Sequence, residues 1–450
     1  MRPYTLHLIA PTTDAHVYEF VECFTMPPIT LLTLAALTPD HYDIRVMDET
    51  VETLVPGPCD LAAISVMYFT AEKAYALADW YRQRHIPVIM GGCHATLCPD
   101  EVLLHCDAVV IGEADDIWRD ILSDFENKRL QPVYRPSAKP DLAKLPPPRY
   151  DLIDKTKYDL QNLVQTGRGC SFGCDFCAIP LLNGRKSRHK AVAQVVAEIR
   201  ASIATSRGLK KRIVFFSDDN IVNNAAYAKE LFRALIPLRI FWASQCALSI
   251  AYDDELLDLA QASGCRGLFI GFETVQQNAL NGVHKRYDAS QYSHYIRKIK
   301  DRGISILGSF LFGLDTDTAD VFRNTVAFCM ANNIDFVNFH LVSPTPGTPF
   351  FQRLEAEQRL LHRQWAYYQE NVTYRPKAMS IRELQDGQIQ AYEEYLSYRN
   401  IFRRVIRHGL PLGRFVMNLA LNIRFRRKVF AGISFQKKFL TYYNRQVLGI

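Results

Sequence analysis

Short apolar runs recur along the first third of the chain, and polar loops and helical stretches separate them. The runs are Tyr4–Ile9, Ile44–Met47, Leu61–Val66, Val88–Met90 and Ala108–Ile111. Residues with helical spacing follow the third and fifth runs, at Thr70–Arg84 and Asp115–Phe125. Strands that alternate with helices predict a parallel sheet covered by helices on both faces. Five such strands fit the doubly wound, flavodoxin-like (Rossmann-like) order.

The residues that end these five strands are the first candidates for a ligand site, because ligands of this fold lie beyond the carboxyl ends of the strands. The candidates are Thr12, Ser65, Met67, Gly91, Gly92, His94, Gly112 and Glu113. Gly91 and Gly92 would let the backbone approach a large flat ligand closely. We expect His94 to be a loop-packing or ligand-edge residue rather than a metal ligand.

A proline-rich stretch follows this first domain. Five prolines lie between Pro136 and Arg149, which predicts a stiff, extended linker. The expected organisation is a first domain over residues 1–135 and a linker over residues 136–160.

The alternation of strands and helices then begins again, which predicts a second α/β domain over residues 161–345. Its candidate strands are Leu163–Gln165, Arg212–Phe216, Phe241–Cys246, Gly267–Ile270, Ser305–Leu311 and Phe336–Leu341. In barrels built this way, the active residues lie at the carboxyl ends of the strands. The remaining residues, 346–450, have mainly helical spacing.

Three cysteines, Cys170, Cys174 and Cys177, follow the first strand of this second domain with the spacing C-x3-C-x2-C. Iron–sulfur clusters held by protein alone usually take four thiolates. Three thiolates on a four-iron cluster leave one iron open to another ligand. A zinc site would need a further ligand pair nearby, and an odd total of 11 cysteines argues against a disulfide framework. The spacing therefore favours an iron–sulfur cluster.

This motif, with the aromatic Phe176 before its last cysteine, resembles that of radical S-adenosylmethionine (SAM) enzymes. The resemblance implies that the open iron of a 4Fe–4S cluster binds SAM, which is cleaved to a 5′-deoxyadenosyl radical. It also implies a partial β6/α6 TIM barrel, and an external electron donor such as flavodoxin or ferredoxin. The other eight cysteines lack ligand spacing, and we expect them to be ordinary thiols.

The run Asp218-Asp219-Asn220 follows the second barrel strand, where the resemblance places polar groups against the SAM amino group. Carboxylate and amide oxygens accept hydrogen bonds from such a cation. The alternative is a helix cap, since a helix is expected next.

Glu273 follows the fourth barrel strand, and the resemblance implies that its carboxylate binds the ribose of SAM. A structural ion pair, with Arg266 as one candidate partner, is the alternative. Gln245 and Ser309, on the third and fifth strands, are weaker candidates for SAM contacts. His340, near the end of the sixth strand, faces the barrel mouth or the core depending on the register, and we expect a core histidine.

The first domain resembles the cobalamin-binding domain that precedes many radical SAM barrels. The resemblance is carried by Met26–Pro39, Asp48-Glu49, Ile89–Thr96 and Asp107–Ala114. The D-x-H-x-x-G motif, whose histidine coordinates cobalt in other cobalamin proteins, is absent from the sequence. Bound cobalamin is therefore an inference from the domain, and an empty domain is the alternative.

Charge is concentrated at the end of the chain. Residues 399–450 contain twelve lysines and arginines and no Asp or Glu, while the whole chain carries +6. A basic, partly apolar tail fits a peripheral membrane contact, and the alternative is helices whose basic faces lie in water. No RNA-binding domain is recognisable, so nucleic acid is not expected as a partner. Without a signal peptide or a long apolar run, we expect a cytoplasmic protein at most peripherally bound to the membrane.

The resemblance as a whole implies a cobalamin-dependent C-methyltransferase that acts on an unactivated carbon of a small-molecule, lipid or isoprenoid natural product. Non-methylating radical chemistry (oxidative cyclisation, ring rearrangement or hydroxylation) is the second hypothesis. A non-catalytic, membrane-associated protein that binds cobalamin or SAM is the third.

Overall fold

The computed structural model describes residues 3–13, 24–368, 371–407 and 412–449 of the chain. The described residues form two compact units. The first comprises residues 3–13, 24–171 and 178–219, and the second comprises residues 172–177 and 220–449.

The first unit contains a parallel sheet of six strands in the order β2-β1-β3-β4-β5-β6. Its strands are β1 Tyr4–Ala10, β2 Tyr42–Asp48, β3 Leu61–Ser65, β4 Val88–Gly91, β5 Ala108–Val110 and β6 Val133–Tyr134. The first five strands confirm the expected flavodoxin-like order. The sixth was not expected, because two residues are too few to give an alternating pattern.

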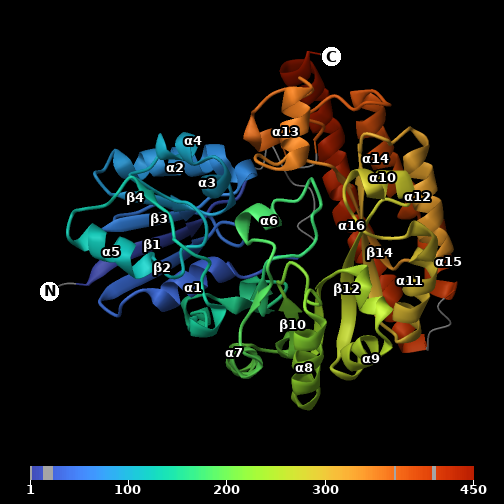
Figure 1. Cartoon of the computed structure of the whole chain (residues 1–450), viewed down its shortest axis with the longest axis horizontal. Coiled ribbons are helices and arrows are strands. Elements are labelled where there is room, and N and C mark those ends of the chain that lie inside the picture. The colour runs from blue at the N-terminus through green and yellow to red at the C-terminus, as the bar shows by residue number, and fades with distance from the viewer. Residues whose placement is uncertain (1–2, 14–23, 369–370, 408–411, 450) are drawn as a thin grey trace. The chain divides into compact units, whose positions relative to one another are not determined.

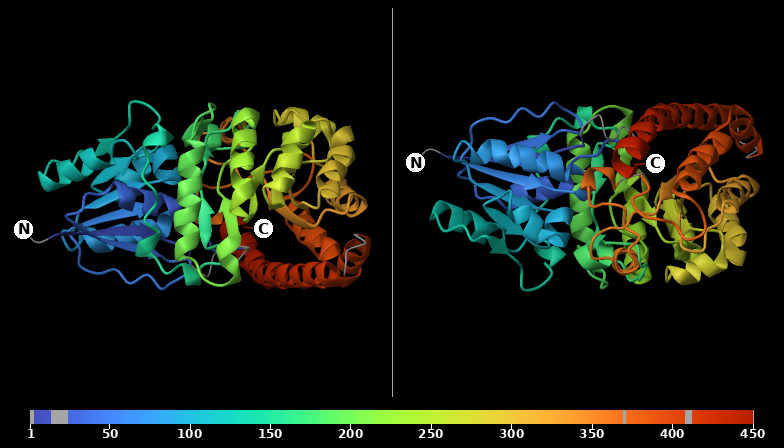
Figure 2. Two further views of the ribbon diagram at one scale, coloured as in Figure 1. Left: turned by 90° about the horizontal axis from the view of Figure 1, so that it is seen from below. Right: turned by 90° about the horizontal axis from the view of Figure 1, so that it is seen from above.

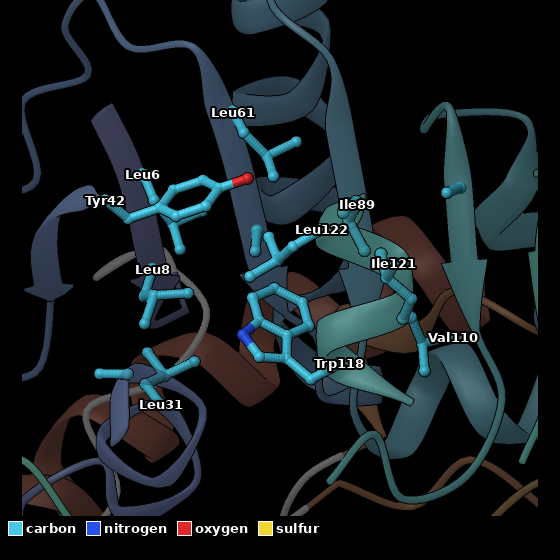
Figure 3. Packing of buried hydrophobic residues seen from close by; sticks show 13 residues of the cluster. Leu6, Leu8, Leu31, Tyr42, Leu61, Ile89, Val110, Trp118, Ile121 and Leu122 are labelled. Atoms are coloured by element: carbon cyan, nitrogen blue, oxygen red, sulfur yellow. The ribbon is translucent and has the colours of Figure 1, made fainter. Parts of the chain in front are cut away.

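Helices cover both faces of this sheet. They are α1 Ile29–Leu37, α2 Ala71–Arg82, α3 Cys93–Leu97, α4 Pro99–Leu103 and α5 Trp118–Glu126. Figure 1 shows α2, α3 and α4 on one side of the sheet and α1 and α5 on the other. Figure 3 shows Trp118 of α5 among leucines of the sheet and of α1, and its side chain is almost fully buried. Its indole nitrogen donates a hydrogen bond to Thr38 Oγ1 at 2.9 Å, which satisfies the polar end of a core side chain.

The rest of the first unit leads into the cysteine motif. One short 3₁₀ helix, Leu142–Lys144, lies within the proline-rich stretch, and two more, Tyr150–Leu152 and Lys155–Lys157, follow it. Then come β7 Asn162–Val164, β8 Gly167–Arg168, α6 Ile179–Leu182, β9 Arg188–His189, α7 Val192–Thr205 and β10 Ile213–Phe216. The parallel pair β7 and β10 was expected, whereas the short antiparallel pair β8 and β9 was not.

The second unit continues the alternation with four parallel strands, β11 Phe241–Cys246, β12 Cys265–Glu273, β13 Ser305–Phe312 and β14 Phe336–Leu341. The helices before and between these strands are α8 Ala225–Leu235, α9 Asp254–Ala262, α10 Gln277–Gly282, α11 Tyr292–Asp301 and α12 Asp320–Ala331. Asn224 caps α8, since its side chain accepts a hydrogen bond from Tyr227 N. The run Asp218-Asp219-Asn220 is therefore not the cap of this helix. All six expected barrel strands, including β7 and β10, are present.

The C-terminal region is helical, as expected, with α13 Pro349–Ala356, α14 Ile381–Tyr395, α15 Tyr398–Arg407 and α16 Leu412–Tyr442. Figure 2 shows α16 as one long helix with α15 beside it. Ser380 and Glu383 form a reciprocal capping box at the start of α14. None of the described helices is both long enough and apolar enough to cross a bilayer.

Candidate active site

A cavity of about 240 Å³ lies in the first unit, at the carboxyl ends of β3, β4 and β5. Five of the candidate ligand residues line it: Ser65, Gly91, Gly92, Gly112 and Glu113. Its other polar or charged lining residues are Thr30, Thr33, Thr96, Asp115, Gln165, Arg168 and Asn183. The cavity thus lies where the fold predicts a ligand site.

Gly92 lines this cavity at a turn whose backbone conformation favours glycine. Its φ of 102° lies in a region that side-chain-bearing residues rarely adopt, and an added Cβ would stand 3.0 Å from both Val66 N and Val66 O. The chain therefore bends sharply between β4 and α3 without placing a side chain at the turn. Such a cradle fits the close approach of a large flat cofactor such as cobalamin.

The remaining candidates of the first domain do not line the cavity. His94 is fully buried, and its Nε2 lies 3.0 Å from the Tyr75 hydroxyl and 3.3 Å from Glu101 Oε1. The Tyr75 hydroxyl also donates to Glu101 Oε1, so these three residues support α3 and α4 by hydrogen bonds. Thr12 N donates to Glu49 Oε2 at 2.9 Å, and Met67 is partly exposed before α2.

Arg168, two residues before Cys170, forms a charge network with the wall of the cavity. Its Nη1 lies 2.7 Å from both Glu113 Oε2 and Asp115 Oδ2, and its Nη2 lies 3.0 Å from Asp115 Oδ1. Arg188 Nη2 bonds the other oxygen of Glu113 at 2.7 Å. Burial by itself would lower the pKa of Arg168, but the two carboxylates outweigh it and raise that pKa. Because bidentate pairs are directional, this network fixes the start of the cysteine loop against Glu113 and Asp115, which follow β5.

Asp218 and Asp219 also hold the start of the cysteine loop. The buried carboxylate of Asp218 accepts hydrogen bonds from Thr166 N and Thr166 Oγ1, and burial raises its pKa to about 7. Asp219 Oδ2 accepts from Gly169 N at 2.9 Å. Gly169 has a φ of 96°, and an added Cβ would stand 2.6 Å from Lys186 O, so only glycine fits before Cys170. These contacts give both aspartates a role in positioning the loop.

In the second unit, a buried ion pair lies beside the cysteine motif. Lys285 Nζ contacts Glu273 Oε1 at 2.8 Å, so the ion-pair partner of Glu273 is Lys285 and not Arg266. Burial alone would lower the pKa of Lys285, but Glu273, Tyr287 and Cys174 outweigh it and raise that pKa. A cation beside a cysteine favours the thiolate that a metal needs.

Glu273 also has an unusual backbone for a non-glycine residue, with a φ of 65°. Strain of this kind costs about 1–3 kcal/mol and gathers at functional sites. Asn220, from the polar run, accepts a hydrogen bond from Ala247 N at 2.9 Å and is buried.

One face of strands β11 to β14 is only partly buried. Gln245, Ser309, Asn338 and His340 lie on this face, with Ser309 paired to Asn338 and Leu311 to His340 in register. His340 is therefore not the core histidine that was expected. The opposite face consists of buried residues such as Phe272 and Phe310, whose rings stack 5.4 Å apart. The polar side chains thus lie on the more accessible face of the sheet.

Sequence reasoning missed Arg168, Asn183 and the residues of α1 as parts of the cavity wall. Arg168 stands inside the cysteine motif, and this position is the one signal that could have found it. Thr30 and Thr33 reach the cavity only through the packing of α1, which no local pattern reveals.

Two family models match separate parts of the chain. A family model described as the radical SAM superfamily matches residues 164–329, and one described as the B12 binding domain matches residues 24–122. The fold, the cavity and the cysteine loop thus define a radical SAM enzyme with a cobalamin-binding domain.

The similarity extends to methyltransferases over most of the chain. The chain is 30% identical over 413 residues to bacteriochlorophyllide d C-12(1)-methyltransferase of Chlorobaculum tepidum, covering 89% of each chain. It is 29% identical over 369 residues to hopanoid C-2 methylase of Rhodopseudomonas palustris, covering 78% of this chain and 68% of that protein. The chain belongs to the family of cobalamin-dependent radical SAM methyltransferases. Its cofactors are a 4Fe–4S cluster, SAM and cobalamin.

Solved structures share the fold at low sequence identity. The methyltransferase TsrM from Kitasatospora setae, with cobalamin and a 4Fe–4S cluster bound, matches with a TM-score of 0.69 and 17% identity, over 95% of this chain and 99% of that one. The cobalamin-dependent radical enzyme OxsB, with aqua-cobalamin and SAM bound, matches with a TM-score of 0.72 and 12% identity, over 95% of this chain and 72% of that one.

Proposed function

We propose that this protein transfers a methyl group to an unactivated carbon of an apolar small molecule, polycyclic or isoprenoid in kind. The observation that carries the proposal is the cavity of the first unit, whose wall includes both the strand ends of the cobalamin-binding domain and Arg168 of the cysteine motif. The cavity of the cobalamin-binding domain is thus joined to the chain just before Cys170, which supports a site where both cofactors take part. The relatives named above act on a bacteriochlorophyllide and a hopanoid, which supports an apolar polycyclic substrate.

The cofactors divide the chemistry between them, and the chain holds them. When bound, the cluster and SAM supply a 5′-deoxyadenosyl radical and cobalamin supplies the methyl group. Cys170, Cys174 and Cys177 would hold the cluster, and Ser65, Gly92 and the other cavity residues would hold cobalamin.

Residues around the cysteine loop would bind SAM and keep the loop in place. We assign Glu273 to the SAM ribose, with Lys285 holding its carboxylate in position. Asp218 and Asp219 would act mainly by positioning the loop, since their oxygens accept hydrogen bonds from its backbone. Asn220 and Phe176 stay candidates for direct SAM contacts.

The accessible face of β11 to β14 supports a substrate site with both apolar and polar walls. Phe269, Leu307 and Leu311 lie on the same face as Ser309 and Asn338. Apolar surface with a few polar groups suits a large hydrophobic ligand that must be held in one orientation. Gln245 and Ser309 lie on the face where either SAM or the substrate would be contacted.

The reaction requires a one-electron donor, and we infer an external protein such as a flavodoxin or ferredoxin. A reducing compartment suits the cysteine thiolates. We therefore place the protein in the cytoplasm, in peripheral contact with the inner face of the membrane.

The test uses anaerobically purified chain, reconstituted with iron and sulfide, supplied with hydroxocobalamin and then desalted. SAM labelled in its methyl group, a reductant, and either a bacteriochlorophyllide or a hopanoid are added. Methylation predicts equal amounts of S-adenosylhomocysteine and 5′-deoxyadenosine, and a product that carries the label. Deoxyadenosine with an unlabelled, altered product would instead support cyclisation, rearrangement or hydroxylation and contradict the proposal.

A further inference from the structure

Helix α15 exposes an apolar stripe along one face. Tyr398, Phe402 and Ile406 are 63%, 52% and 53% exposed, and their spacing of four residues places them on one side of the helix. The other side, with Ile401 and Val405, is almost fully buried. Helix α15 is thus held in the fold by one apolar face and presents a second one to its surroundings.

Arginines border this exposed stripe. Arg399 and Arg403 are exposed on the same helix, each one residue from a member of the stripe. The guanidinium of Arg426, from α16, lies 4.3 Å from the centre of the Tyr398 ring. The last 52 residues contain no carboxylate that could neutralise these cations within the tail.

Arg404 shows that the arginines of this region are not all surface charges. It is buried, and its guanidinium donates to Tyr395 O at 2.7 Å and to Asn422 Oδ1 at 3.0 Å. This residue therefore joins α14, α15 and α16, whereas Arg399 and Arg403 remain directed outward. The fold thus separates a structural arginine from those that border the stripe.

We propose that the outer face of α15, defined as Tyr398, Arg399, Phe402, Arg403 and Ile406, docks on an anionic lipid surface. Apolar side chains bordered by arginines are the pattern of an interfacial helix, in which the apolar face enters the headgroup boundary and the cations meet lipid phosphates. Tyrosine is enriched at that boundary because its ring is apolar and its hydroxyl is polar. Since none of the described helices can span a bilayer, the contact is peripheral.

The charge of the region favours lipid over the other occupants of an apolar face. A second copy of the same face would bring arginines against arginines, which costs free energy. An acidic protein would satisfy the cations, but its carboxylates would not cover the apolar side chains of Tyr398, Phe402 and Ile406. A fluid anionic surface satisfies both the charges and the apolar side chains.

Vesicle flotation of the full chain, loaded with its cofactors under anaerobic conditions, tests this surface. Phosphatidylcholine vesicles are compared with vesicles containing phosphatidylglycerol. We expect the chain to float with the anionic vesicles and to be released by salt. The double variant Phe402→Gln and Ile406→Gln should lower lipid binding at least about tenfold, and each of Arg399→Gln and Arg403→Gln about fivefold.

Leu104→Gln is the matched control, because Leu104 is 74% exposed but belongs to the first unit, and it should float like the wild type. Failure of the wild type to float with anionic vesicles, or wild-type flotation by the double variant, would overturn the proposal. If the wild type forms a dimer in solution and the double variant does not, the outer face of α15 binds a second copy of the chain instead. If polyglutamate competes with anionic vesicles as well as added vesicles do, the face binds an acidic peptide.

The docking proposal is independent of the proposed reaction. Formation of 5′-deoxyadenosine in detergent-free solution should be unchanged in the double variant, since its residues touch neither the cavity nor the cysteine loop. Loss of lipid binding with retained cleavage of SAM therefore separates the two proposals.

Discussion

Lys285 and Lys155 are both buried, yet their surroundings move their pKa values in opposite directions. Lys285 has Glu273 as a partner, and its pKa is raised. Lys155 donates to uncharged oxygens of Asn162 and Ser202, and burial lowers its pKa to about 8. A buried cation without a carboxylate thus loses its proton more readily.

Lys155 predicts a pH dependence of stability. The unfolded lysine holds its proton up to about pH 10.5, whereas the folded one releases it near pH 8. Between these values the unfolded state binds more protons, so the free energy of unfolding should rise with pH, by about 3 kcal/mol at most. In Lys155→Met the thermal midpoint should rise less between pH 8 and pH 10 than in the wild type. The exposed Lys157→Met is the control, and an identical pH profile for wild type and Lys155→Met would contradict the prediction.

The cysteines of the motif make a second prediction at this scale. Cys174→Ala removes one of three thiolates and should abolish the visible absorption of the reconstituted cluster. Formation of 5′-deoxyadenosine should fall more than about 100-fold, beyond the 10–100-fold typical of losing a supporting residue. Cys59→Ala, outside the motif, should keep both signals, and a Cys174→Ala protein with normal cluster absorption would show that the cysteine is not a ligand.

At the scale of the elements, the chain turns sharply between the buried strand β4 and helix α3. Val88 and Met90 bury their side chains within the sheet, and Gly92 turns the chain at once into α3. The strand ends and the helix begins within two residues, so no loop side chains obstruct the cavity. We therefore expect the geometry of this turn to control the binding of a cofactor in the cavity.

Gly92→Ala should close this cradle. The Cβ would meet the Val66 backbone at 3.0 Å, and the backbone conformation costs a non-glycine residue about 1–3 kcal/mol. We expect retention of cobalamin after desalting to fall at least about tenfold, measured by its visible spectrum. Gly282→Ala, at the end of α10 with no neighbouring atom within 4 Å of its added Cβ, should retain cobalamin normally. Equal retention by the two variants would place the cofactor elsewhere.

At the scale of the whole molecule, Arg168 joins residues that lie far apart in the sequence. It belongs to the cysteine motif by sequence, but its guanidinium is bound to Glu113 and Asp115 from the cobalamin-binding domain. The network is buried, so losing one partner leaves an uncompensated charge, which costs about 3–5 kcal/mol. The residues just before Cys170 and the cavity wall are therefore held together within the first unit.

Arg168→Lys keeps the charge but cannot make the bidentate pair. We expect both cofactors to remain bound while the ratio of 5′-deoxyadenosine to methylated product rises, because the radical and the methyl group are less well aligned. Arg149→Lys, which alters a bidentate pair with Asp151 at the surface, should leave that ratio unchanged. If Arg168→Lys keeps the wild-type ratio of 5′-deoxyadenosine to methylated product, the network has only a structural role.

Much of the architecture follows from local pattern. The five strands of the first sheet, the six barrel strands and the helical C-terminal region were predicted, because strand and helix periods are properties of neighbouring residues. The strand pair β8 and β9 was missed because each strand has only two residues. The helical stretch after Ile381 is interrupted between Tyr395 and Tyr398, and the buried Arg404 donates a hydrogen bond to Tyr395 O at this break.

The sequence by itself determined the cluster motif, the order of the two domains and the strand ends that carry the candidate ligands. These features depend on spacing along the chain, which folding does not change. Only the tertiary structure decided that Asp218 holds Thr166, that Glu273 pairs with Lys285, and that Arg168 and α1 complete the cavity wall. Such contacts join residues distant in sequence, and their energies depend on which groups burial brings together.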